Sequence, residues 1–297
     1  PNMVHIVIQK ILQATGNMIA PMWFQIAGVV FNFVFDPLLI FGIGPFPKMG
    51  VVGAAVATVL GYVVSTIIAL IQLFLTKQKV KPVFKNCLEP QMIKLIFSYG
   101  LPSFVMNALG AFTVNFANMF LVRYSDTAVA FFGAYFKVQQ LIFMTVNGLI
   151  QGCLPIMRFN YRAKEYGRLK QANKSGTIIA TVMMIVGMLL VLIFPKEILF
   201  LFSASEEMCA FGVPAMRIMS LGFVFSGFSA MIATYEQATD SIMPGVVVQL
   251  LRQGVLLVPV IWLLNSAVQM TGIWLAFPIT EFVTFLVAVV FAKIKNH

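Results

Sequence analysis

Asn32 and Asp36 stand four residues apart in the apolar stretch VVFNFVFDPLLIFG, and Pro37 directly follows the acid. Residues at this spacing project from the same face of a helix. A charged side chain at the centre of a bilayer costs about 2.5–3.5 kcal/mol on insertion scales, so an acid there marks a functional site by default. Desolvation also favours the neutral form of a carboxyl group. The pattern therefore predicts a site that takes up and releases a proton or holds a small cation.

Two neighbouring features extend this site. Pro37 has no N–H, so the carbonyl of Phe33 loses its helical partner, and we expect a locally broken helix with a free carbonyl beside the carboxylate. Thr58 lies on the next apolar segment in GAAVATV, whose small residues permit close helix contact. We predict an ion- or proton-binding site of Asp36, Asn32 and Thr58. In the alternative interpretation, Asp36 lies solvated near the outer membrane surface and marks a helix end.

Other polar residues inside apolar segments are weaker candidates. Glu281 is the best second acid for coupling, and its charge could be neutralised by Lys137, Arg217 or Arg252, although the sequence does not assign the partner. For amide side chains in membrane helices, hydrogen bonding between helices is the plainer interpretation. The candidates for lining a substrate cavity are Asn107, Gln140, Asn147 and Glu281.

The elements that carry these residues are predicted by hydropathy. The chain is 60% hydrophobic and 10% charged, against about 45–50% apolar and about 25% charged residues in soluble domains. A membrane-spanning helix needs about 20 mostly apolar residues. Eight segments meet this length, so the fold class is an all-α membrane protein of about eight transmembrane helices. They are residues 18–41, 51–75, 93–122, 128–157, 175–195, 209–235, 242–264 and 271–292.

Basic residues orient these segments. If the segments alternate in direction, fourteen of the twenty Lys and Arg residues fall on one side, mainly within 77–94, 158–174 and 293–295. Short loops rich in Lys and Arg face the cytoplasm. The distribution therefore predicts a multi-pass protein of the inner or plasma membrane with a cytoplasmic C-terminus.

A weak internal repeat suggests how the segments are organised. The triplet at Gln13 recurs at Gln237, an offset of 224, and the Gly-led helix at Gly53 is followed by a similar one at Gly272. Six predicted helices separate the copies, so the halves would be parallel repeats. We expect residues 1–75 to form the C-terminal part of an N-lobe, with the end of its fourth helix and its fifth and sixth helices. Residues 76–90 would be a cytoplasmic linker and 91–297 a C-lobe of six helices. On this interpretation the chain is N-terminally truncated.

Other function classes find little support. The three cysteines, Cys87, Cys153 and Cys209, have no metal-ligand spacing, and both histidines lie near the chain ends. No Ser/Lys pair or His/Glu set at helical spacing suggests an enzyme, and we expect no metal or organic cofactor. The net charge is +10, but no basic stripe interleaved with aromatics indicates nucleic-acid binding. A purely structural membrane protein would not need an intramembrane acid beside a helix break.

Several motifs resemble one transporter family. QATGN, NFVFDPLLIFG and GVVGAAVAT are similar to the fifth and sixth helices of the MATE (multidrug and toxic compound extrusion) transporters. FSYGLPSF is similar to the start of their seventh helix and GIWLAFPITE to their twelfth. The pattern is closest to the MepA-like and DinF-like bacterial branches. The resemblance implies two six-helix lobes, alternating access, and antiport of organic cations against protons or sodium ions.

The resemblance also implies roles for residues. Asn32, Asp36 and Thr58 match a polar site in the family's N-lobe. Gly110 stands about where some branches carry an acid, which favours proton coupling over a second-lobe sodium site. The implied partners are small organic cations and membrane lipids, with no nucleic acid, in a monomer of the bacterial inner membrane. The alternative is a lipid-linked oligosaccharide flippase of the same superfamily, which would carry a more cationic cavity.

Overall fold

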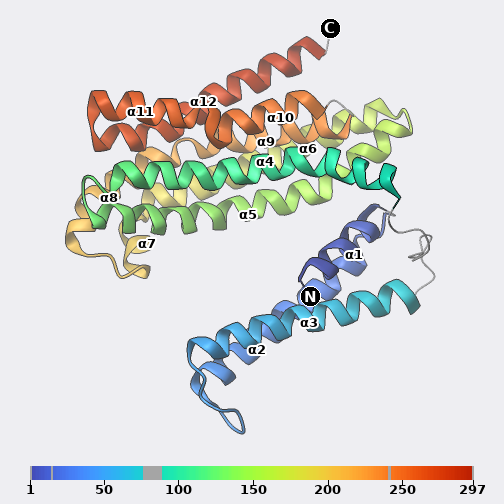
Figure 1. Ribbon diagram of the computed structural model, residues 1–297. Coiled ribbons are helices and arrows are strands. Elements are labelled where there is room, and N and C mark those ends of the chain that lie inside the picture. Colours follow the sequence, from blue (N-terminus) through green and yellow to red (C-terminus); the bar gives the residue numbers. More distant parts are fainter. Residues whose placement is uncertain (1, 15, 76–88, 240–241, 296–297) are drawn as a thin grey trace. The chain divides into compact units, whose positions relative to one another are not determined.

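The described residues of the computed structural model, 2–14, 16–75, 89–239 and 242–295, are helical apart from short turns and connections (Figure 1). Six stretches of helix among them are long and apolar enough to cross a membrane. Helices satisfy their own backbone hydrogen bonds, which a bilayer requires of any spanning segment. The prediction of an all-α membrane protein is therefore confirmed. The predicted number of eight spans is not confirmed: two further apolar helical stretches among the described residues are shorter, Leu257–Val268 and Ala108–Leu121, the second being the C-terminal part of the longer helix Pro90–Leu121.

The chain divides into two compact units, Pro1–Glu89 and Pro90–His297. Most of the predicted linker, residues 76–88, lies outside the described part of the chain. The first unit holds α1 (Asn2–Ala14), α2 (Ile19–Phe41) and α3 (Val51–Leu75). Its buried cluster joins all three helices and consists of Ile8, Leu12, Phe24, Ala69 and Leu73.

The second unit is a helical bundle in which α5, α6 and α9 pack against one another (Figure 1). Its core is rich in aromatic rings, with Phe131 and Phe132 of α5 packed on Trp274 of α12. Its elements are α4 (Pro90–Leu121), α5 (Asp126–Arg162), α6 (Tyr166–Ile193), α7 (Pro195–Leu201), α8 (Glu206–Ser220), α9 (Phe223–Ala238), α10 (Ile242–Leu250), the π-helical turn η1 (Leu251–Val255), α11 (Leu257–Val268) and α12 (Met270–Lys295).

Three segment boundaries differ from the prediction. The basic stretch 158–174 is not a loop: α5 runs to Arg162 and α6 starts at Tyr166. Lys and Arg are good helix formers, and their long side chains reach water from helix ends. Hydropathy alone therefore predicts the end of α5 too early and the start of α6 too late. The segment predicted over 209–235 is divided between α8 and α9. The segment predicted over 242–264 contains η1.

The two copies of the repeat occupy similar local positions. Helix α1 ends at Ala14 and α9 at Ala238, the middle residues of the two triplets. Gly53 lies against the backbone carbonyl of Leu39, and Gly272 lies in the same way against that of Leu264. A Cβ at either glycine would overlap that carbonyl group. The same close approach between consecutive helices therefore occurs once in each unit, while the parallel relation of the two units stays a prediction.

Candidate functional site

The candidate site is positioned by a close crossing of α2 and α3. Gly28 and Gly61 face each other there, and a Cβ on either residue would lie 2.8 Å from the other's carbonyl oxygen. Small residues let helix backbones approach in membranes. Asn32 lies one turn beyond Gly28, and Thr58 lies about one turn before Gly61. The crossing therefore brings the two polar side chains together.

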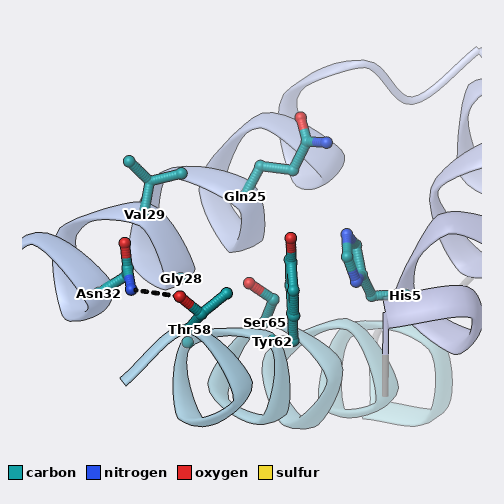
Figure 2. Close-up of a pocket in the computed structure, with 9 residues that line it drawn as sticks. His5, Gln25, Gly28, Val29, Asn32, Thr58, Tyr62 and Ser65 are labelled. Atoms are coloured by element: carbon teal, nitrogen blue, oxygen red, sulfur yellow. Dashed lines mark hydrogen bonds between the residues drawn. The ribbon is translucent and has the colours of Figure 1, made fainter. Parts of the chain in front are cut away.

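A single amide group joins the three predicted site residues. Asn32 Nδ2 donates to Asp36 Oδ1 at 3.2 Å and to Thr58 Oγ1 at 3.3 Å, the second of these bonds being drawn in Figure 2. The Thr58 hydroxyl in turn donates to the Ala54 carbonyl at 2.9 Å. The acid, the amide and the hydroxyl thus form a short hydrogen-bonded chain across α2 and α3. The structure brings together all three residues that the spacing and the GAAVATV pattern singled out.

The expected helix break at Pro37 is wrong. Helix α2 continues through Pro37 to Phe41 and ends at Gly42, whose left-handed backbone donates to the Leu38 carbonyl. Proline removes one backbone hydrogen bond, but in a membrane helix neighbouring groups and small local adjustments can compensate. Asp36 is half-buried and lies five residues before the helix end. The site is therefore built on a continuous helix.

A cavity of about 340 Å³ opens beside Asn32 and Thr58 within the first unit. Its lining comes from α1, α2 and α3 and combines polar side chains with the two crossing glycines (Figure 2). The cavity has room for several water molecules or a small organic group. The lining residues are His5, Gln25, Gly28, Val29, Asn32, Thr58, Gly61, Tyr62 and Ser65.

His5 closes the other end of this cavity and was not recognised from the sequence. Its ring stacks on Tyr62 with centroids 5.9 Å apart (Figure 2) and meets Phe24 edge-on at 6.3 Å. The side chain is only 5% exposed, and its Nδ1 is buried without a hydrogen-bond partner. A signal existed: His5, Ile8 and Leu12 follow helical spacing on the buried face of α1. From the sequence, His5 was set aside because it lies near the start of the chain, so this helical spacing was not considered.

The remaining candidates belong to the second unit. Gln140 and Asn147 lie exposed on α5. Asn107 lies on α4, and its side chain is outside the described part. Glu281 pairs with Arg252 within the second unit, Oε1 to Nε at 2.9 Å. Packing thus assigns the partner that the sequence left open.

The groups at the rim of the cavity offer hydrogen-bond chemistry. A carboxyl group accepts hydrogen bonds when ionised and donates one when protonated, and Asp36 is the carboxyl group that the Asn32 amide contacts. No group of three or more His, Cys, Asp or Glu side chains that could hold a metal ion occurs among the described residues. The site also contains no activated nucleophile recognisable by a paired base.

Comparison with known proteins supports a transport fold. The MatE family profile matches residues 102–263. The multidrug export proteins MepA of Staphylococcus aureus and Staphylococcus saprophyticus are each 26% identical, over 93% and 95% of this chain, which spans 60% and 61% of their lengths. An outward-facing multidrug resistance transporter of the MATE family superimposes with a TM-score of 0.85 at 21% identity, covering 98% of this chain and 65% of that one. A MOP superfamily transporter from Pyrococcus furiosus gives a TM-score of 0.86 at 21% identity, over 98% and 65% of the respective chains.

Proposed function

The chain belongs to the MatE family, and on this basis we propose that it acts in secondary active multidrug export, exchanging organic cations for protons by alternating access. The support in the first unit is the Asn32 amide, which bonds both the Asp36 carboxylate and the Thr58 hydroxyl at the rim of a cavity. We place the protein in the bacterial plasma membrane as a multi-pass monomer with its C-terminus in the cytoplasm, as a transport protein and not an enzyme.

Protonation of Asp36 provides the coupling step. An ionised Asp36 accepts from Asn32 Nδ2, and a protonated Asp36 becomes a donor itself. The protonated group keeps an acceptor oxygen, but it is a weaker acceptor for Asn32 Nδ2 than the charged carboxylate. The Asn32 amide then shares its hydrogen bonds differently between Asp36 and Thr58, which changes the lining of the cavity. A ligand shifts a conformational equilibrium only through its different affinity for the two states. Proton binding at Asp36 therefore biases the cavity between a state that holds a cation and one that releases it.

Hydrogen-bond polarity favours a proton over a sodium ion. Sodium is a hard cation and would need several oxygen ligands, by analogy with other such ions. Asn32 turns its Nδ2, an N–H donor, toward both Asp36 and Thr58. An N–H group pointing at the carboxylate repels a metal cation but is compatible with a proton on the acid. A flippase for lipid-linked oligosaccharides is less favoured, because Arg252, one of the few cations in the second unit's interior, is already engaged by Glu281.

The test is drug efflux driven by an imposed pH gradient in proteoliposomes, comparing Asp36→Asn with Asp126→Asn. Asp126 is an exposed acid in the first turn of α5, so its substitution matches the chemical change outside the site. We expect Asp36→Asn to abolish pH-driven efflux and Asp126→Asn to retain it. Equal efflux by the two variants would refute the role of Asp36. Efflux that follows a sodium gradient at constant pH would show that the coupling ion is sodium and not the proton.

A further inference from the structure

One exposed ridge of α6 changes from polar to apolar along the helix. Residues four apart form such a ridge on a helix surface, and every member of the ridge that begins at Tyr166 is an exposed side chain. The first three members carry polar groups and the last three carry none, so the change is abrupt. In order along α6 they are Tyr166, Lys170, Lys174, Ile178, Val182 and Val186.

The change from lysine to isoleucine marks the depth of the bilayer surface. Ile178, Val182 and Val186 are each more than half exposed and belong to a 28-residue apolar helix of membrane-spanning length. From Ile178 to Val186 the helix rises by about 12 Å, which fits within one leaflet of a hydrocarbon core about 30 Å thick. Lys174 comes one turn before Ile178, so its side chain reaches the headgroup layer. A tyrosine in that layer, here Tyr166, is typical of membrane interfaces.

The two lysines of the ridge carry charge that no neighbour offsets. Like charges four residues apart destabilise a helix, and neither Lys170 nor Lys174 has an ion-pair partner in the part of the chain that the structure describes. Both lie in the stretch 158–174, which contains six Lys or Arg residues and one acid, Glu165. A negatively charged group bound between the lysines would remove their repulsion. The ridge is therefore suited to hold an anion.

The apolar half of the ridge decides which anion fits. A nucleic acid or a free phosphate ion would contact the lysines but would leave Ile178 and Val182 uncovered. A phospholipid with a net negative headgroup matches both halves, with its phosphate at the lysines and its acyl chain on the apolar side chains. The predicted orientation places this end of α6 at the cytoplasmic leaflet, whose anionic lipids attract basic segments. A zwitterionic lipid fits less well, because its headgroup carries a cation that the lysines repel.

We propose that this ridge of α6 is a binding site for one anionic phospholipid. Its phosphate bridges the ammonium groups of Lys170 and Lys174, the Tyr166 hydroxyl bonds a headgroup oxygen, and one acyl chain lies along the apolar half of the ridge. The two lysines are about 6 Å apart along the helix axis, and their flexible stems let both ammonium groups converge on one phosphate. The lipid stays on the outer surface of the bundle, so the proposal is independent of what the protein transports.

The test is native mass spectrometry of the full 297-residue chain, which resolves protein with and without one bound lipid. The protein is delipidated in detergent and titrated with phosphatidylglycerol or phosphatidylcholine of the same chain length. We expect tighter binding of phosphatidylglycerol, and equal affinity for the two lipids overturns the proposal. Lys170→Gln combined with Lys174→Gln should weaken phosphatidylglycerol binding about thirtyfold, because each lysine near an anionic lipid contributes roughly fivefold. Phosphatidylcholine binding should stay unchanged.

The matched control combines Arg123→Gln with Lys196→Gln. It removes two exposed cations from other parts of the second unit, so we expect the affinity for phosphatidylglycerol to stay unchanged. An equal loss of affinity in the control and in the double lysine variant shows a general effect of charge and overturns the site. Unchanged affinity in the double lysine variant overturns it as well. Lys170→Arg combined with Lys174→Arg keeps both charges and should retain binding, and loss of binding by this variant contradicts a phosphate held by charge.

Competition on the unsubstituted protein identifies the occupant and does not depend on any variant folding. Glycerol 3-phosphate presents a phosphate without acyl chains, so a hundredfold excess should leave the bound phosphatidylglycerol in place. Its displacement by glycerol 3-phosphate would show a site for free phosphate. Displacement by poly(U) RNA would show a nucleic-acid surface. Either result overturns the proposal of a lipid site.

Discussion

Gly61→Ala is the substitution that most directly tests the helix crossing beneath the candidate site. The added Cβ would lie 2.8 Å from the Gly28 carbonyl oxygen and 3.2 Å from the Asn32 Cβ, whereas ordinary contacts start at 3.4 Å. Helices α2 and α3 must therefore separate by roughly 0.6 Å at this point, a strain of the kind that costs about 1–3 kcal/mol when a core is overpacked. Alanine returns about 0.5–1 kcal/mol through its better helix propensity. The net expectation is destabilisation of roughly 0–2.5 kcal/mol, with a central value of about 1 kcal/mol.

The same movement affects the site. The Asn32 Nδ2–Thr58 Oγ1 bond is already 3.3 Å long, and a separation of that size takes it beyond hydrogen-bonding distance. We therefore expect Gly61→Ala to lower the melting temperature of the purified protein and also to reduce pH-driven efflux by folded protein. Both effects come from one change in the distance between α2 and α3.

Gly133→Ala is the matched control for this experiment. Gly133 lies inside α5, and nothing stands within 4 Å of the position that its Cβ would take. The substitution there keeps only the gain in helix propensity, so we expect stability to rise by about 0.5–1 kcal/mol. Melting followed by size-exclusion chromatography compares the two variants. A Gly61→Ala protein as stable as Gly133→Ala would refute the close crossing and the reasoning built on it.

Two further predictions concern single hydrogen bonds. Thr58→Val removes the hydroxyl that accepts from Asn32 but leaves the Asn32–Asp36 bond. We therefore expect pH-driven efflux to be reduced but not abolished, and its pH dependence to shift. A pH profile identical to that of the unsubstituted protein would contradict a role for Thr58. Ser125→Ala removes the N-cap of α5, whose hydroxyl accepts from Ala128 N at 3.0 Å, and should lower stability by about 1 kcal/mol in the same melting assay, with transport by folded protein unaffected. An unchanged melting temperature would show that this cap contributes nothing.

Helix type and approximate helix position were predictable because they depend on local properties. Apolar segments of bilayer length must be helical, since a bilayer offers no other partner for the backbone. The prediction failed where composition does not report geometry. Pro37 did not break α2, and the basic residues after 158 did not end α5 or delay α6, because both features are compatible with a helix whose surroundings accommodate them.

The polar residues also divide into those placed by local periodicity and those placed by packing between helices. Asn32 and Asp36 lie four residues apart on one helix, so the periodicity of that helix placed them together. His5 and Thr58 reach the same cavity from α1 and α3, and their positions there depend on how these helices pack on α2. Glu281 could have paired with several cations by sequence, and the structure selects Arg252, twenty-nine residues away.

The sequence by itself determined that this chain is a helical membrane protein with an acid and an amide on one face of its second helix. That much follows from hydropathy and from the fixed rise and turn of a helix, which need no knowledge of the neighbours. Only the tertiary structure decided which helices touch, since contact depends on where small residues such as Gly28 and Gly61 let two backbones approach. For that reason the cavity beside Asn32 and the pairing of Arg252 with Glu281 appear only in three dimensions.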